Sequence, residues 1–232
     1  MDRNYLHKIV DEIPDSKLIE AQRCLERLWP GRRDFVFGVD LDGVCADFYA
    51  GMRPIAAKWL GVELETLTPE VSVGLREWGV DKAPGGYPAL HRYAVTQCDL
   101  FRNLQPVPGA PQALRRLSEK GVRIRIITHR LYIKYFHQKA IDQTIEWLDR
   151  HDIPYWDLCF MKDKAAVGAN LYIDDSPENV VRLRDAGLRA IVFSNSTNRD
   201  LAGPRADNWT EVEKIVLDEM EQWNVRRASA GR

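Results

Sequence analysis

Two aspartates stand two positions apart at the end of an apolar segment. Residues 35–47 read FVFGVDLDGVCAD, in which Asp40 and Asp42 follow β-branched and aromatic residues and precede Gly43. Such a run is typical of a strand buried on both faces, and in an open parallel sheet the carboxyl ends of the strands border the ligand-binding crevice. One carboxylate could attack an electrophile while its neighbour donates and accepts the proton. An Asp-rich turn that uses Gly43 for its positive φ explains this segment equally well by itself.

Two further segments end in polar side chains. Residues 122–128 (VRIRIIT) alternate like a strand and end in Thr128, whose hydroxyl could hold a phosphoryl oxygen. Residues 170–175 (NLYIDD) end in Asp174 and Asp175. Two facing pairs of acids repel each other unless a cation lies between them. A small set of carboxylate oxygens suits Mg²⁺, which also binds substrate phosphate.

Lysines precede the third of these segments. Lys162 and Lys164 lie in residues 161–164 (MKDK) and could neutralise both the nucleophile and an incoming phosphate. Together with the strand ends they predict a phosphoryl-transfer site.

These motifs resemble, in order, those of the haloacid dehalogenase superfamily, and specifically its Mg²⁺-dependent phosphatase branch. Within that superfamily the sequence is most similar to the 5′(3′)-deoxyribonucleotidases. The likeness runs from about Phe35 to Phe193, and the segments that carry it are DGVCADF (42–48), PVPGA (106–110), KDK (162–164) and LYIDD (171–175).

The resemblance implies a role for each catalytic residue. Asp40 is expected to attack phosphorus and form an aspartyl-phosphate, and Asp42 to act first as acid and then as base. Thr128 is expected to bind the transferring phosphoryl group. Lys164 matches the family lysine by its spacing from the acidic pair, although Lys162 is close enough to keep the choice open.

The implied cofactor is Mg²⁺. Asp175 is expected to bind the ion directly with Asp174 as its supporting partner, and Asp40 and the backbone carbonyl of Asp42 complete the protein ligands.

Three residues are candidates for substrate binding. Phe48 occupies the family's aromatic position and could stack against a base, or it could only close a hinge. His129 replaces a residue that is often Ser in the nucleotidases. It could add a donor beside the phosphate or cap the next helix. Lys162 is the third candidate.

The composition limits the function classes. The 232 residues are 45% hydrophobic with a formal net charge of −1, so no global charge attracts a nucleic-acid polymer or a membrane. Four cysteines with no Cys-x-x-Cys pair indicate neither a zinc knuckle nor a disulfide framework, and no apolar stretch is long enough for a membrane span. A cytoplasmic enzyme is expected, with a small phosphorylated substrate as its partner and homodimerisation left open. Asp42 also argues against dehalogenase chemistry, because a halide leaves without a proton.

The predicted fold is α/β: a three-layer, doubly wound, Rossmann-like parallel sheet with a small helical cap inserted after the first strand. We expect an N-terminal helical extension over 1–33, a core formed by 34–46 and 106–232, and the cap over 47–105. Helices are expected at 48–60, 90–100, 111–120, 132–150, 177–186 and 209–223, a loop at 83–88 and a frayed end at 228–232.

Three functions are compatible with these patterns. The favoured one is a Mg²⁺-dependent phosphomonoesterase, a 5′-nucleotidase that acts on (deoxy)nucleoside monophosphates. The same chemistry on another small ester, such as a sugar phosphate, is the first alternative, and a non-catalytic binding module on the same fold is the second.

Overall fold

The computed structural model describes residues 12–14, 17, 34–132 and 136–230. The predicted N-terminal helical extension therefore falls almost entirely outside the described residues. Residues 35–223 form one compact unit. All predicted site residues belong to the unit of 35–223. No helix of the described residues combines the length and the apolar character that crossing a membrane requires.

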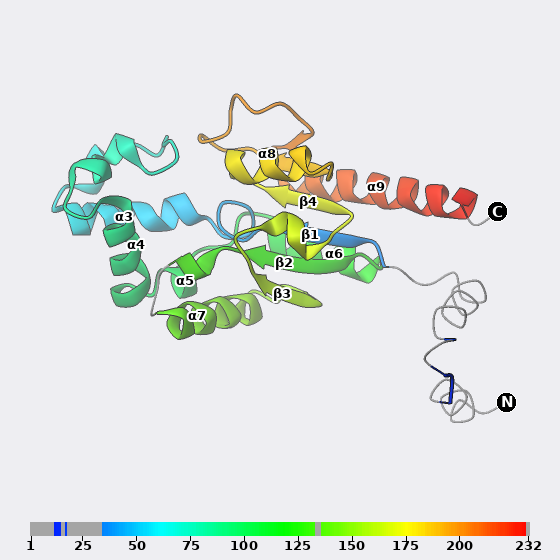
Figure 1. The fold of residues 1–232 in the computed structure, drawn as a ribbon. Helices are drawn as coiled ribbons and strands as arrows, with labels where there is room; N and C mark the ends of the chain where they lie inside the picture. The colour runs from blue at the N-terminus through cyan, green and yellow to red at the C-terminus, as the bar shows by residue number, and fades with distance from the viewer. Residues whose placement is uncertain (1–11, 15–16, 18–33, 133–135, 231–232) are drawn as a thin grey trace. The chain divides into compact units, whose positions relative to one another are not determined.

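A parallel sheet lies at the centre of this unit (Figure 1). Within the described residues it has six strands in the order β3-β2-β1-β4-β5-β6, and every neighbouring pair is parallel. The strands are β1 (Val36–Val39), β2 (Arg123–Thr128), β3 (Asp157–Phe160), β4 (Leu171–Asp174), β5 (Ala190–Phe193) and β6 (Arg205–Ala206). The α/β prediction is confirmed, and β6 is a strand that the sequence did not reveal.

Both faces of the sheet are covered by helices. Successive strand residues point to opposite faces, and the neighbours Ile126 and Ile127 accordingly belong to two different hydrophobic clusters. The cluster of Ile126 includes residues of α6 (Ala110–Glu119), α7 (His137–Arg150) and α9 (Trp209–Ala230), whereas that of Ile127 includes residues of α8 (Pro177–Asp185). This arrangement gives the predicted three layers.

The register of the sheet aligns the strand ends that carry the candidate site. Val39 at the end of β1 pairs with Ile126 of β2 and with Ile173 of β4. The residues that follow these positions therefore lie at one edge of the sheet.

A long insertion separates β1 from β2. It contains α3 (Phe48–Leu60), α4 (Gly86–Gln97), α5 (Leu100–Asn103) and the short 3₁₀ helices η2 (Leu64–Thr66), η3 (Arg76–Trp78) and η4 (Val80–Lys82). Its two ends lie side by side, because the Asp47 N–H donates to the Gln105 carbonyl at 2.9 Å. The insertion and the sheet belong to the same compact unit.

Several helix boundaries differ from the predictions. The expected loop at 83–88 already contains the start of α4, because Gly85 (φ 79°) turns the chain into a helix that begins at Gly86. The helix expected at 90–100 ends at Gln97, since Asp99 (φ 48°) interrupts it before α5. The helix expected at 132–150 begins at His137, after the 3₁₀ helix η5 (Arg130–Tyr132).

The end of the chain also differs from the prediction. The segment 228–232 was expected to fray, but α9 continues to Ala230. The residues between Trp223 and Ala230 include no Gly or Pro that would stop a helix. Residues 231 and 232 lie outside the described part of the chain.

Candidate functional site

The carboxyl ends of β1, β2 and β4 meet at a cavity of about 380 Å³. Asp40, Asp42, Lys164 and Asp175 line it, together with aromatic residues of the insertion. The structure thus gathers acids and a lysine that are up to 135 positions apart in the sequence.

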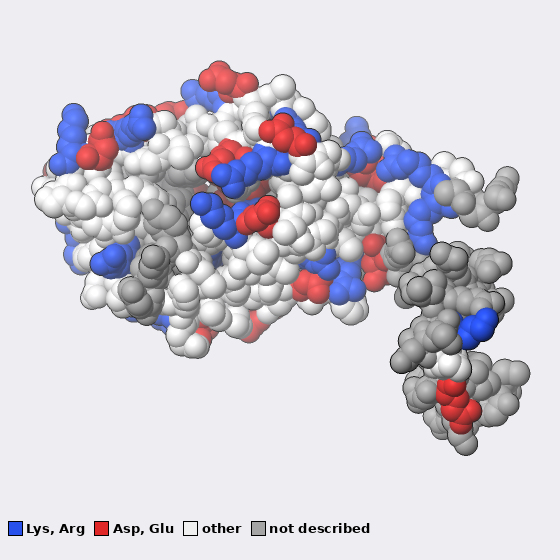
Figure 2. Space-filling model, in the orientation of Figure 1, with Lys and Arg blue, Asp and Glu red and all other residues white. Residues whose placement is uncertain are grey.

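The rim of the cavity carries charges of both signs. Lys162, Glu178 and Arg182 all border it, and acidic and basic side chains are also interspersed over the face drawn in Figure 2. Because the described residues at this rim carry both signs, groups inside the cavity are the candidates for recognising an anionic ligand.

Lys164 lies at the centre of the buried charges. Its Nζ donates to Asp40 Oδ1 and to Asp174 Oδ2, both at 2.6 Å. Burial opposes the ammonium charge, but the carboxylates of Asp174 and Asp40 together raise the pKa of Lys164 above its ordinary value. Lys162 is exposed and lines the rim instead. Of the two lysines considered from the sequence, it is Lys164 that contacts Asp40.

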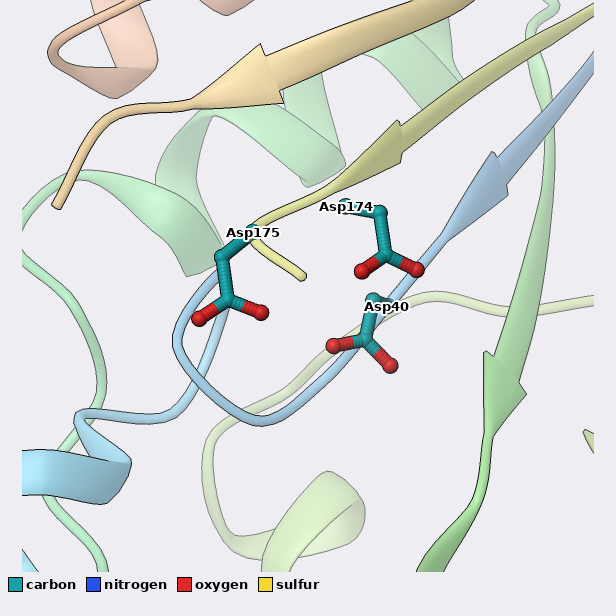
Figure 3. A group of neighbouring side chains, drawn as sticks. All are labelled: Asp40, Asp174 and Asp175. Atoms are coloured by element: carbon teal, nitrogen blue, oxygen red, sulfur yellow. The ribbon is translucent and has the colours of Figure 1, made fainter. Parts of the chain in front are cut away.

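Three carboxylates converge on one point beside this lysine. Asp40, Asp174 and Asp175 each place an oxygen within 4.8 Å of the other two (Figure 3). Asp174 is also held by the Ser176 N–H at 2.9 Å and by the Asn179 side-chain amide at 3.1 Å. Asp174 is therefore fixed on both oxygens, which suits a supporting role.

Asp175 is held from two sides. The Asn195 side-chain amide donates to Asp175 Oδ2 at 2.7 Å, and the Tyr49 hydroxyl of α3 reaches the same oxygen at 3.5 Å. Gly43 (φ +83°) passes so close that a Cβ at this position would lie 2.1 Å from that oxygen. Only glycine allows the loop after Asp42 to close onto Asp175.

The carboxylates carry more negative charge than one lysine compensates. Burial raises the pKa of Asp40 to about 7, against the lowering effect of Lys164 and with smaller contributions from Asp174 and Asp42. Burial also raises the pKa of Asp175 well above its usual range, and the charges of Asp40 and Asp174 add to this. A divalent cation would relieve this repulsion, and a purely oxygen donor set fits Mg²⁺.

The hydroxyl of Thr128 lacks a hydrogen-bond partner within the described residues. Its oxygen, Oγ1, is buried at the end of β2. A buried hydroxyl without a partner costs stability. A ligand oxygen could satisfy it, as predicted for the phosphoryl group.

Asp42 has a partner that the sequence analysis missed. Arg130 donates to its carboxylate through Nη2 at 2.7 Å and through Nε at 3.0 Å and 3.2 Å. The Arg130 side chain is 0% exposed and that of Asp42 is 24% exposed. The available signal was the position of Arg130 two residues after Thr128, which repeats the spacing of Asp42 after Asp40.

Comparison with known proteins places this constellation in a family. Residues 34–222 match the family model described as "5' nucleotidase, deoxy (Pyrimidine), cytosolic type C protein". The chain belongs to this family. It is a haloacid dehalogenase superfamily phosphatase of the deoxyribonucleotidase family.

Curated relatives cover most of the chain. A protein from Chlorobaculum tepidum whose name provisionally assigns it as a 5′(3′)-deoxyribonucleotidase is 55% identical over 80% of this chain and 91% of its own length. The human 5′(3′)-deoxyribonucleotidase, cytosolic type, is 29% identical over 75% of this chain and 90% of its own.

Solved structures support the fold alone. A haloacid dehalogenase-like hydrolase from Streptococcus pneumoniae has a TM-score of 0.52 at 15% identity, covering 78% of this chain and 98% of that one. A phosphonoacetaldehyde hydrolase-like protein from Oleispira antarctica has a TM-score of 0.54 at 14% identity, covering 82% and 93%.

The insertion of this deoxyribonucleotidase-family chain supplies an aromatic wall. Phe48 is almost fully buried, lines the cavity and packs edge-on against Tyr49 with ring centroids 5.5 Å apart. His91 lies 6.4 Å from the Phe48 ring, and its pKa falls to about 4, chiefly because of burial. His91 is therefore neutral at physiological pH.

His129 and Lys162 border the cavity on the core side. Burial lowers the pKa of His129, and the nearby charges of Lys162 and Lys164 lower it further. In the ligand-free protein the neutral imidazole of His129 is therefore favoured at neutral pH. The 3₁₀ helix η5 begins directly after it.

Proposed function

We propose that this chain is a Mg²⁺-dependent 5′-nucleotidase that hydrolyses (deoxy)nucleoside monophosphates through an aspartyl-phosphate. The observation that carries the proposal is the contact of buried Lys164 with Asp40 beside Asp174 and Asp175. A carboxylate, an ammonium group and an oxygen-rich metal cradle are what phosphoryl transfer to an aspartate requires.

In the first half of the proposed reaction, a carboxylate oxygen of Asp40 attacks phosphorus. The bond from phosphorus to the ester oxygen breaks, and Asp42 gives its proton to that oxygen so that an alcohol leaves. Thr128 and Lys164 hold the oxygens of the transferring group, where hydrogen bonds and positive charge stabilise the transition state most.

In the second half, the ionised Asp42 takes a proton from water. The water oxygen attacks the phosphorus of the aspartyl-phosphate, the bond to Asp40 breaks, and inorganic phosphate leaves. Asp42 is then protonated for the next cycle, and Asp40 is again a carboxylate. The protons therefore balance over one turnover.

The metal would be held by Asp40, Asp175 and the Asp42 backbone carbonyl. Asp174 would support these ligands without binding the metal directly. When bound, Mg²⁺ neutralises the phosphate charge and orients it for attack.

Residues 47–105 are proposed to act as a cap that selects the substrate. The residues of the aromatic wall, Phe48, Tyr49, Tyr87, His91 and Phe101, line the same cavity as the acids. A planar base could stack on Phe48, because aromatic rings contribute large contact areas with a preferred geometry. The names of the two curated relatives support a nucleotide as substrate, and that of the human cytosolic type supports a cytoplasmic location.

The test is phosphate release from a panel of nucleoside monophosphates, sugar phosphates and p-nitrophenyl phosphate, with Mg²⁺ or with EDTA. We expect one group of nucleotides to dominate, turnover to require metal, and Asp40→Asn to abolish it. An exposed acid provides the matched control, and Asp185→Asn is expected to retain full activity. Metal-dependent turnover of sugar phosphates alone would contradict the proposed nucleotide substrate. The absence of any Asp40-dependent turnover would overturn the chemistry.

A further inference from the structure

We propose that Arg130 is a positioning residue for Asp42. Arg130 fixes the carboxylate of Asp42, to which the proposed reaction assigns proton transfer. Arg130 also contacts both the core and the insertion, so the position of Asp42 depends on both. This inference rests on the proposed function, because it concerns the residue to which that function assigns acid and base catalysis.

The ion pair has the geometry that fixes a carboxylate in two directions. Arg130 uses Nε and Nη2, the two donors on one edge of its planar guanidinium group, at distances between 2.7 Å and 3.2 Å from the oxygens of Asp42. A planar pair of donors sets both the position and the plane of the carboxylate, whereas a lysine would set only a distance.

Arg130 is itself held firmly. Its Nη1 donates to Thr144 Oγ1 of α7 at 3.2 Å, and that hydroxyl donates to the Ala140 carbonyl at 2.7 Å. The centre of the guanidinium group also lies 4.3 Å from the ring centroid of Phe101, on α5 of the insertion. Cation–π contacts of this kind are strongest when both groups are shielded from water. Because Arg130 is itself held in place, its hydrogen bonds can fix the orientation of the Asp42 carboxylate.

The alternative is that Arg130 binds the substrate directly. Arg130 lies at the border of the cavity, but its side chain is 0% exposed while Asp42 remains partly accessible. Each of Nε, Nη1 and Nη2 already donates to Asp42 or Thr144. The donors of Arg130 are therefore used within the protein, and it is the partly exposed carboxylate of Asp42 that a ligand in the cavity can reach.

A double-mutant cycle tests this inference. Turnover of p-nitrophenyl phosphate with Mg²⁺ is measured for Arg130→Met in the wild-type background and in the Asp42→Asn background. If Arg130 acts through Asp42, its loss should lower kcat about tenfold or more when Asp42 is present and less than about twofold when it is absent, as expected for coupled residues in contact. Arg130→Lys should give an intermediate kcat, because it keeps the charge and loses the planar pair of donors.

Arg116→Met is the matched control. Arg116 of α6 pairs with Glu213 through the same Nε and Nη2 edge at 2.6–3.1 Å, and neither residue is among those that line the cavity. We expect this variant to leave kcat unchanged. Melting temperatures are measured for every variant, and Thr144→Val replaces Arg130→Met if the latter does not fold. Thr144→Val loosens the arginine without removing it and should lower kcat with the same dependence on Asp42.

Binding of inorganic phosphate, measured by calorimetry, gives a readout besides turnover. A positioning role predicts that Arg130→Met binds phosphate within about twofold of the wild type. A tenfold weaker affinity, or an equal loss of kcat in both Asp42 backgrounds, would show that Arg130 contacts the substrate and would overturn the inference while leaving the proposed chemistry intact. Failure of the proposed function is recognised separately, by turnover that persists in Asp40→Asn.

Discussion

The Nζ atom of Lys164 lies 2.6 Å from Oδ1 of Asp40, and both side chains are buried. A lysine in this position neutralises the proposed nucleophile, Asp40, before any ligand arrives. It must also hold together carboxylates that would otherwise repel one another.

Lys164→Met is expected to destabilise the metal-free protein. Removing one partner from a buried ion pair leaves uncompensated charge, and we expect the free energy of unfolding to fall by about 3 kcal/mol or more. Urea unfolding in EDTA measures this, and added Mg²⁺ should restore part of the loss. Lys162→Met is the matched control, because Lys162 is exposed, and its effect should stay within about 0.5 kcal/mol. Equal effects of the two substitutions would contradict the role given to Lys164.

Thr128→Val should separate stability from activity. The Thr128 hydroxyl is buried without a partner in the described protein, so its removal should leave the free energy of unfolding unchanged or raise it by up to about 1 kcal/mol. Turnover should fall about 100-fold, because the donor proposed to contact the phosphoryl oxygens is lost. Unfolding in urea and kcat on the best substrate measure the two effects.

Thr144→Val is the contrast for stability. Thr144 is equally buried but donates to the Ala140 carbonyl, so its loss should cost about 1 kcal/mol. If Thr128→Val destabilised the protein as much, the hydroxyl would have a structural partner and not a ligand-binding role.

Gly43→Ala should abolish the response to metal. A Cβ at this position meets Asp175 Oδ2 at 2.1 Å and also imposes the strain of a positive φ, which costs about 1–2 kcal/mol. Gly121→Ala carries the same strain (φ +89°) but meets nothing within 4 Å. Both variants should therefore lose stability, but only Gly43→Ala should lose the rise in melting temperature with Mg²⁺. A normal metal response in Gly43→Ala would argue against Asp175 as a ligand.

Magnesium affinity should rise with pH. Burial raises the pKa of Asp40 to about 7 and that of Asp175 above its usual range in the metal-free protein, so protons compete with the metal below these values. Between about pH 6 and pH 8 the affinity should increase, and binding should release protons. Calorimetry in two buffers of different ionisation enthalpy measures both quantities.

Asp157→Asn is the control for this pH dependence. The pKa of Asp157 is lowered, first by its hydrogen bond from Arg123, so this carboxylate is ionised throughout the range and its loss should leave the dependence unchanged. Metal binding that is independent of pH and releases no protons would mean that Asp40 and Asp175 are already ionised before the ion arrives.

The sequence predicted the strand ends of the site because each strand carries its own local signal. Apolar runs that stop at Asp40, Thr128 and Asp174 identify the carboxyl edge, and parallel pairing then brings these ends together. The pairing of Arg130 with Asp42 has a weaker signal, because Arg130 follows the end of its strand by two residues and no apolar run ends at it.

Short elements escaped prediction for a related reason. The strand β6 consists of Arg205 and Ala206 alone, which is too short for any periodic pattern. The early start of α4 depends on the conformation of Gly85, and a loop and a helix start are equally compatible with the residues around it.

The insertion leaves the core and returns to it at neighbouring points. The Asp47 N–H donates to the Gln105 carbonyl at 2.9 Å, and the Val107 N–H donates to the Cys45 carbonyl at 2.7 Å. The insertion is therefore a loop whose two ends are held together by the core. The entropic cost of closing such a loop grows only slowly with its length, by roughly 0.6 kcal/mol per doubling. Evolution can therefore change the length of this segment at little cost in loop-closure entropy, provided that the residues that contact the carboxylate edge, such as Tyr49 and Phe101, are kept. Substrate preference can diverge among descendants of one ancestor while the reaction itself is inherited unchanged.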